Sequence, residues 1–407
     1  MSNTLFEHSW AADPLTFDIN RLDPHFVEDP FATYARLRAE SPVHRNPDGS
    51  YFLTRYADVR ALLLDDRMTS DKSKEFPPMF GNNAYLEHLL NTMVFNDPPR
   101  HTRIRKRLSY AFTPKAMSNW EPQVISTVDE LLDDMAAKGE FDLITDYAYS
   151  LPVAIIAGLL AVPKLDRELF RKWSMAITNP LNNSPTPDAI AIGSSAVDEF
   201  KEYFRALIAL RRKTPGADLI SALLEVQDEE GHELTELEML HNCAFLLNAG
   251  HETTTNLIGN SMKALFNNPG ALKRLREHPE LMVSAVEEFL RYDSPNQLGG
   301  RRCVPDVEIG GTSIPAGTFI WISNGAANRD GEQFPDPDRL DLERSPNRHL
   351  AFGFGIHLCL GAALARLEAR LGISGLIGRF PQLRPMGLPV SRGHPRYRGV
   401  RSYRVAI

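Results

Sequence analysis

Cys359 lies at a position where its sulfur could do chemistry. It follows a loop rich in glycine and phenylalanine and comes directly before a run of good helix formers, Ala362 to Glu368. The dipole and the free N–H groups at the start of a helix favour a thiolate. A thiolate in an apolar loop can bind a soft metal or a haem iron, whereas a lone cysteine is more often a buried structural thiol.

A second candidate is an acid beside an alcohol, Glu252 and Thr253. The pair lies in the longest predicted helix, which runs from Thr235 to about Asn267, and Thr235 with Glu238 forms a capping box at its start. Gly250 and three consecutive threonines lower helix propensity at this point. Such a weak point indicates a site, although a glutamate next to a threonine is usually only a surface pair.

The elements that must position these residues are mostly helical. We expect helices over 56–64, 118–137, 145–161, 195–213 and 281–292, a hairpin over 42–55, and a small antiparallel sheet within 297–345. Residues 67–96 read as an irregular, apolar segment, and 179–188 as a loop. No linker or internal repeat divides the chain, so a single domain over 1–407 is expected.

Composition excludes several classes of function. The net charge of −7 argues against nucleic-acid binding. No apolar stretch is long enough for a signal peptide or a membrane span, so we expect a cytoplasmic protein without membrane contact. Three cysteines are a poor disulfide framework and fit a reducing compartment.

The spacing F-G-x-G-x-H-x-C-x-G resembles the haem-binding signature of the cytochrome P450 superfamily, with matches at Phe352, Gly353, Gly355, His357, Cys359 and Gly361. The resemblance implies a mainly α fold with a small β region, and haem b (iron protoporphyrin IX) held by Cys359. It also implies a monooxygenase that inserts one oxygen atom of O2 into an organic substrate. Electrons would come from NAD(P)H through a ferredoxin reductase and a ferredoxin.

The same resemblance assigns the other site residues. Glu252 and Thr253 would deliver protons beside Ala249 and Gly250, where the missing side chain lets oxygen approach. Phe352 would line the haem loop, and the propionates would be bound by His101, Arg105, Arg301 and His357. Glu288 and Arg291 would form a structural network with Arg339.

The substrate pocket is expected to be mainly apolar, for a medium-sized hydrophobic molecule with at least one hydrogen-bonding group. Residues 76–95 would form a mobile lid over it. Its lining residues would be Phe245, Asn248, Ala249, Gln297, Leu298 and Tyr397. An acidic ferredoxin would dock on a basic cluster made by Arg100, Arg103, Lys106 and Arg107.

Three alternatives remain open from the sequence. The chain could bind haem without turnover, or it could use peroxide or rearrange its substrate; the intact Glu252–Thr253 pair disfavours both. A zinc site using His357 and Cys359 lacks a second ligand pair at finger spacing.

Overall fold

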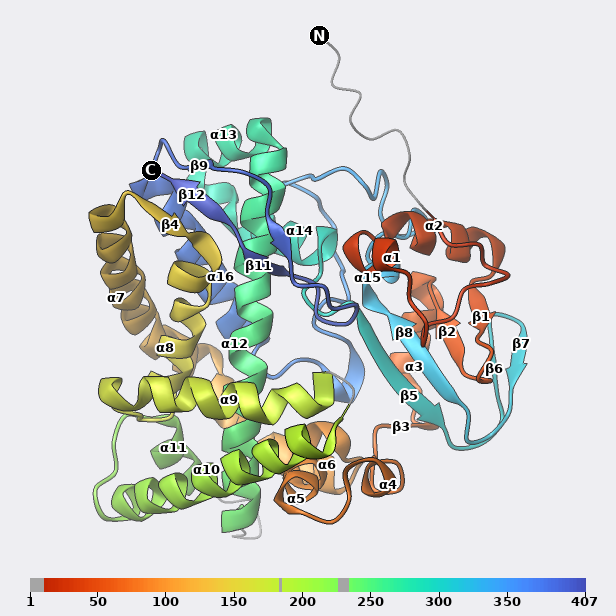
Figure 1. The fold of residues 1–407 in the computed structure, drawn as a ribbon, viewed down its shortest axis with the longest axis horizontal. Coiled ribbons are helices and arrows are strands. Elements are labelled where there is room, and N and C mark those ends of the chain that lie inside the picture. The colour runs from red at the N-terminus through yellow and green to blue at the C-terminus, as the bar shows by residue number, and fades with distance from the viewer. Residues whose placement is uncertain (1–10, 183–184, 226–233) are drawn as a thin grey trace.

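The computed structural model describes residues 11–182, 185–225 and 234–407, and Figure 1 shows a helical half beside a smaller β-rich half. The helical half contains α4 (Phe76–Phe80), α5 (Ala84–Asn91), α6 (Arg100–Ser109), α7 (Pro114–Lys138), α8 (Ser150–Leu159), α9 (Arg167–Asn182), α10 (Pro187–Lys213), α11 (Leu219–Glu225), α12 (Glu236–Asn267), α13 (Pro269–Glu277), α14 (Met282–Tyr292) and α16 (Ala362–Arg379). Short 3-10 turns and one π-helical segment join them: η1 (Met93–Phe95), η2 (Tyr110–Phe112), η3 (the π-helix, Leu143–Ala148), η4 (Lys164–Asp166), η5 (Pro279–Leu281) and η6 (Gly355–His357).

The long helix α12 is the axis of the helical half (Figure 1). It begins with the predicted capping box: the Thr235 hydroxyl accepts the Glu238 N–H at 3.2 Å, and the Glu238 carboxylate accepts the Thr235 N–H at 3.1 Å. The helix continues unbroken through Gly250 and the threonines that follow. It packs against α5, α8, α9, α10, α14 and α16, so its middle turns lie inside the protein.

The β-rich half is built on a five-stranded sheet in the order β1 (Val43–Arg45), β2 (Tyr51–Leu53), β8 (Phe319–Ser323), β5 (Leu298–Cys303) and β3 (Met68–Thr69). β2 and β8 are parallel and the other neighbours are antiparallel. This half also holds α1 (Pro24–Glu28), α2 (Phe31–Glu40), α3 (Tyr56–Leu64), α15 (Asn324–Ala327) and the hairpin of β6 (Val307–Ile309) with β7 (Thr312–Ile314).

Two small sheets lie with the helical half (Figure 1). One is ordered β4 (Glu140–Asp142), β12 (Arg404–Ala406), β9 (Arg384–Pro385), and the other pairs β10 (Val390–Ser391) with β11 (Val400–Ser402). The predicted fold class, mainly helical with a small β region, is confirmed.

Two predicted irregular segments are in fact largely helical. Residues 76–95 form α4, α5 and η1, because prolines are accepted in the first turn of α4 and the Asn83 side chain caps α5 by accepting the Leu86 N–H at 3.0 Å. α9 and α10 likewise extend into the predicted loop at 179–188, and Thr186 caps α10.

The predicted Glu288–Arg291 network is present, but its third arginine is wrong. Arg291 and Glu288 form a fully buried ion pair at 2.8 Å. The guanidinium that joins them belongs to Arg344, whose Nε lies 3.1 Å from Glu288 Oε2. Arg339 contributes only its backbone carbonyl to Arg291, and its side chain is exposed beside Asp341.

Candidate haem site

The loop that carries Cys359 lies between η6 and α16 and has a defined backbone. The Cys359 N–H donates to the Phe352 carbonyl at 2.9 Å. Gly353 and Gly355 adopt left-handed φ angles of 69° and 72°. A Cβ at 355 would collide with the carbonyl oxygen of Leu63, so only glycine fits there.

Cys359 is exposed as a residue, but burial of its thiol by the surrounding protein atoms raises the pKa of that thiol. Hydrogen bonding from the Gly361 backbone and the charge of Arg105 act in the opposite direction. The first turn of α16 therefore does not by itself give the thiolate that the sequence predicted. Metal ligation would supply the missing stabilisation, since a bound metal displaces the thiol proton.

A group of basic side chains gathers on the same side of the structure as Cys359. His101 and Arg105 come from α6, Arg301 comes from β5, and His357 precedes the cysteine in its loop. The imidazole rings of His101 and His357 are 4.1 Å apart. Burial and the neighbouring cations lower the pKa of His357 to about 3, and burial also lowers the pKa of Arg301 and Arg105.

These basic groups lack acidic partners that would bond them. Both ring nitrogens of His101 and Nε2 of His357 are buried without a hydrogen-bond partner in the described part of the chain. The nearby Asp97 carboxylate already accepts from Thr69 and from the Ser70 N–H. Buried ring nitrogens without a protein partner are met by water or by a ligand, and the cations Arg105 and Arg301 beside these rings favour an anionic ligand. Haem b carries two propionate carboxylates and an iron that accepts a thiolate, so the residues present fit this group.

The middle of α12 carries the predicted acid and alcohol. The Thr253 hydroxyl donates to the Ala249 carbonyl one turn earlier, at 3.0 Å. Glu252 is largely buried and pairs with Arg392 at 2.9 Å. The sequence analysis missed Arg392; its only signal was the basic composition of the tail, with arginines at 392, 396, 398 and 401.

The predicted pocket residues on α12 divide between two faces. Phe245, Ala249 and Thr253 are partly or fully exposed, and they recur every four residues on one face. Asn248 is buried, and its Oδ1 has no partner among the described residues. A Cβ at Gly250 would make an ordinary contact with Ile156 of α8 at 3.6 Å. The predicted approach of oxygen at Gly250 stays a prediction.

The remaining predicted pocket residues lie elsewhere or are only partly exposed. Gln297 is fully buried and donates to the Ser294 carbonyl at 2.8 Å. Leu298 packs in the N-terminal apolar cluster with Phe17 and Phe26. Gln297 Oε1, like Asn248 Oδ1, is buried without a partner among the described residues, so the pocket roles of Gln297 and Leu298 stay predictions. Tyr397 is partly exposed and forms a β-bridge with Asn296.

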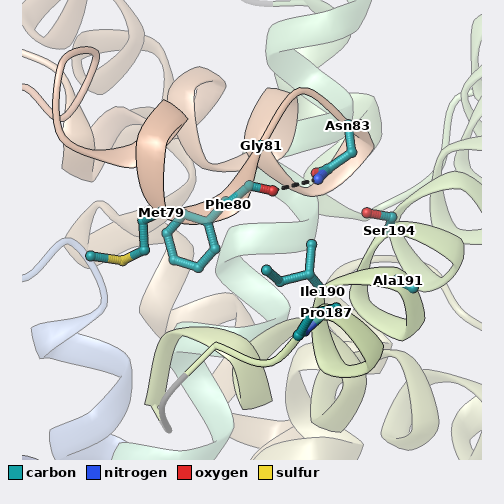
Figure 2. Close-up of a pocket in the computed structure, with 8 residues that line it drawn as sticks. All are labelled: Met79, Phe80, Gly81, Asn83, Pro187, Ile190, Ala191 and Ser194. Atoms are coloured by element: carbon teal, nitrogen blue, oxygen red, sulfur yellow. Dashed lines mark hydrogen bonds between the residues drawn. The ribbon is translucent and has the colours of Figure 1, made fainter.

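A separate hollow of about 620 Å³ lies between the α4–α5 segment and the start of α10 (Figure 2). Met79 and Phe80 line one wall, and Pro187, Ile190 and Ala191 line the other. The α4–α5 segment is ordered by an aromatic cluster in which Phe76 contacts Phe80 and Phe95. The structure thus replaces the predicted irregular lid with two short packed helices.

The predicted basic docking cluster on α6 is mostly engaged within the protein. Arg103 forms an ion pair with Glu238 at the start of α12. Arg107 is buried and donates to the Arg103 carbonyl at 2.9 Å. Arg100 donates to Asn91 at 2.5 Å. Lys106 alone of the four is fully exposed at the surface.

The described residues contain neither a membrane-spanning helix nor a cluster of metal-ligating side chains. None of the helices there is long and apolar enough to cross a membrane. No group of three or more histidine, cysteine, aspartate or glutamate side chains in those residues could hold a metal ion, so the zinc alternative gains no support.

Comparisons with known proteins agree with this geometry. The family model named Cytochrome P450 matches residues 43–387. Cytochrome P450 monooxygenase PikC of Streptomyces venezuelae is 41% identical over 405 residues, covering 96% of this chain and 94% of its own. Vitamin D(3) 25-hydroxylase of Pseudonocardia autotrophica is 41% identical over 363 residues, covering 88% of each chain.

A solved structure shares the fold as well. CYP109E1 from Bacillus megaterium in complex with testosterone has a TM-score of 0.84 and 34% identity, over 93% of this chain and 99% of that chain. The chain belongs to the cytochrome P450 family of monooxygenases, which bind haem b through a cysteine thiolate.

Proposed function

We propose that Cys359 binds the iron of haem b and that the protein hydroxylates, or oxidises in a related way, a medium-sized, mainly apolar organic substrate. The observation that carries the proposal is the group formed by His101, Arg105, Arg301 and His357, whose cations and unpartnered imidazole nitrogens favour carboxylates close to Cys359. In the overall reaction, a C–H bond, O2, two electrons and two protons give an alcohol and one water molecule.

When bound, the haem supplies the oxygen chemistry, and the thiolate of Cys359 favours O–O cleavage. The chain's own residues have other tasks. Thr253 holds its hydroxyl against the Ala249 carbonyl, which leaves the oxygen lone pairs to accept a hydrogen bond. Glu252 is the carboxylate next to it in sequence, and we assign it to the relay of protons from solvent.

The relatives support the apolar substrate class. Testosterone and vitamin D3 are both largely apolar molecules with few hydrogen-bonding groups. CYP109E1, solved in complex with testosterone, is 34% identical to this chain, and the protein named Vitamin D(3) 25-hydroxylase is 41% identical. The exposed face of α12, with Phe245 and Ala249, offers apolar contact. Asn248 adds one buried carbonyl oxygen that a substrate hydroxyl could meet.

We further propose that a ferredoxin supplies the electrons in the cytoplasm, from NAD(P)H and a ferredoxin reductase. The notion of a docking site on four basic residues of α6 needs revision, because Arg103 is tied to Glu238. Lys106→Glu is the test chosen, because Lys106 is the most exposed of the four positions. If ferredoxin docks at this position, the variant should show slower electron transfer and a weaker dependence of the rate on salt concentration. If the variant changes neither the rate nor its salt dependence, docking at this position is excluded.

The ligand assignment is tested by spectroscopy. Reduced protein with carbon monoxide should show the red-shifted Soret band of a thiolate adduct, and Cys359→His should abolish it. Cys303→Ser, which changes a buried cysteine of β5, is the control and should keep the band. A wild-type spectrum like that of a histidine-ligated globin would rule out Cys359.

The role of Thr253 is tested by the coupling ratio, which is the amount of product formed per NAD(P)H consumed. Thr253→Ala should bind substrate and accept electrons normally, but it should divert reducing equivalents to peroxide and lower the product formed per NAD(P)H. Thr255→Ala is a matched control, because Thr255 makes the same bond to the carbonyl one turn earlier, at 2.8 Å, from a buried face. Equal coupling in both variants would remove Thr253 from proton delivery.

A further inference from the structure

The ion pair between Glu252 and Arg392 joins two distant parts of the chain. Glu252 lies in the middle of α12, and Arg392 follows β10 in the C-terminal segment. Arg392 Nη2 is 2.9 Å from Glu252 Oε1; the Glu252 side chain is 10% exposed and that of Arg392 is 33% exposed. The pair therefore reaches from a buried carboxylate to the protein surface.

Two side chains near this pair, Asn256 and Tyr149, have polar atoms without a protein partner among the described residues. Asn256 lies one turn after Glu252 on the same face of α12, next to Gly399, and neither side-chain polar atom has a partner within the described ranges. The buried hydroxyl of Tyr149 is unpartnered in the same set of residues. Glu252 and Arg392 both act on the pKa of Tyr149, which burial raises to about 12, so this hydroxyl keeps its proton.

His251 is a further buried polar residue close to Tyr149. The Tyr149 and His251 rings are 5.5 Å apart, and His251 Nδ1 lies 3.2 Å from the Ser174 hydroxyl. Buried polar atoms without protein partners are ordinarily met by ordered water. The polar groups of Tyr149 and Asn256 would thus bind water on either side of the Glu252–Arg392 pair.

We propose that Arg392 is the positioning residue of the proton relay. It fixes the Glu252 carboxylate and marks the place where protons enter from solvent, between α12 and the segment that joins β10 to β11. This proposal rests on the proposed function, because Glu252 must carry protons for Arg392 to matter. The order along the route is solvent, water beside the ion pair, the Glu252 carboxylate and then Thr253; the Arg392 guanidinium keeps its protons and only holds the carboxylate in place.

The geometry favours this role over a purely structural one. A surface ion pair contributes little to stability, and a buried one is often no better than an apolar pair of the same shape. Arg392 holds the Glu252 carboxylate next to the Thr253–Ala249 face of α12, where a carboxylate can exchange protons with water. If the ion pair served only stability, unpartnered polar atoms next to it would be a disadvantage, because buried polar atoms without partners destabilise the folded protein.

The test compares holoenzyme variants Arg392→Gln, Arg392→Lys and Glu252→Gln, with Arg401→Gln on β11 as the exposed control. The readouts are the rate of product formation, its solvent deuterium isotope effect, the carbon monoxide spectrum, and substrate affinity from the spin-state titration. Arg392→Gln should lower the rate about tenfold and raise the isotope effect. The spectrum and the affinity should not change, and Arg392→Lys should restore most of the rate.

A readout independent of turnover is a crystal structure of the haem-loaded wild type, which should show ordered water at Asn256 and Tyr149. Dry side chains there would overturn the proposal. So would a wild-type rate and isotope effect in Arg392→Gln when Glu252→Gln loses activity. If Glu252→Gln itself behaves as wild type, the proton role of Glu252 in the proposed function fails, and the role of Arg392 fails with it.

Discussion

Arg344 places its Nε 3.1 Å from Oε2 of Glu288, and its guanidinium also donates to the carbonyls of Pro335 and Asp336. Glu288 in turn accepts from Arg291 and from the backbone N–H of Asp341. One buried carboxylate on α14 therefore organises the irregular segment that leads to the cysteine loop. Both oxygens of the Glu288 carboxylate are bonded, which is the condition under which a buried charge is stable.

Arg344→Ala should destabilise the protein because it leaves part of the Glu288 charge uncompensated. Removing one member of a buried ion pair costs about 3–5 kcal/mol. Arg339→Ala is the matched control, since the Arg339 side chain is exposed and contributes only its carbonyl. In thermal unfolding, Arg344→Ala should melt at a clearly lower temperature than Arg339→Ala. Equal melting temperatures would contradict the assignment of Arg344, rather than Arg339, as the third member of the Glu288–Arg291 network.

Glu368 should make stability depend on pH. It is buried in α16, and burial raises its pKa to about 8, with the Thr254 hydroxyl opposing the shift. The folded protein holds this proton where the unfolded chain has released it, so the contribution is complete below pH 4.5 and is lost as pH rises toward 8. The loss is up to about 1.4 kcal/mol per pH unit across this interval.

Glu368→Gln should remove that dependence, because an amide is neutral at every pH and its carbonyl oxygen can still accept from the Thr254 hydroxyl. The measurement is the melting temperature of both proteins at pH 5, 6.5 and 8. The melting temperature of Glu368→Gln should rise relative to that of the wild type as the pH increases. Glu202→Gln, on the exposed face of α10, should track the wild type. Parallel curves for wild type and Glu368→Gln would show that the carboxyl is ionised throughout.

Local signals in the sequence located much of the fold and the cysteine loop. The capping box of Thr235 and Glu238 set the start of α12 correctly, and α12 ends at Asn267 as expected. The glycine spacing around Cys359 identified a backbone that only glycine can adopt at Gly355. Such features depend on residues close together in the chain, and the residue types alone encode them.

The predictions from sequence that proved wrong or incomplete concern helix capping and contacts between residues far apart in the chain. Asn83 and Thr186 are good N-caps, but the prolines and glycine near them favoured loops in the sequence reading. Arg339 and Arg344 are chemically the same and five residues apart, so only the path of the chain decides which one meets Glu288. The Glu252–Arg392 pair spans 140 residues of sequence, and no local pattern announces it.

His101 should hold the haem rather than take part in turnover. His101→Phe keeps an aromatic ring in the buried site but removes both unpartnered nitrogens. Loss of a hydrogen bond to a charged group should speed haem transfer to an apoprotein scavenger about tenfold. The thiolate band with carbon monoxide should persist in the fraction still loaded. His278→Phe, at an exposed position, is the control, and equal release rates would remove His101 from the propionate site.

Asn248 should anchor a polar group of the substrate. Its Oδ1 is buried and unpartnered in the part of the chain that the structure describes, next to the exposed face with Phe245 and Ala249. Asn248→Leu should weaken substrate binding about threefold to tenfold, as expected for one neutral hydrogen bond, or shift the oxidised position. Haem content should stay as in the wild type. Asn248→Asp, which keeps an acceptor oxygen of the same shape, should retain more of the affinity.

The same variant separates this anchor from a buried oxygen that only meets water. If water is the partner, Asn248→Leu removes an awkward polar atom and should leave affinity and regioselectivity unchanged while stability holds or rises. If the substrate is the partner, affinity or regioselectivity must change whatever happens to stability. A spin-state titration, product analysis and a melting curve on one preparation distinguish the two, and unchanged affinity with unchanged products would end the case for Asn248 as an anchor.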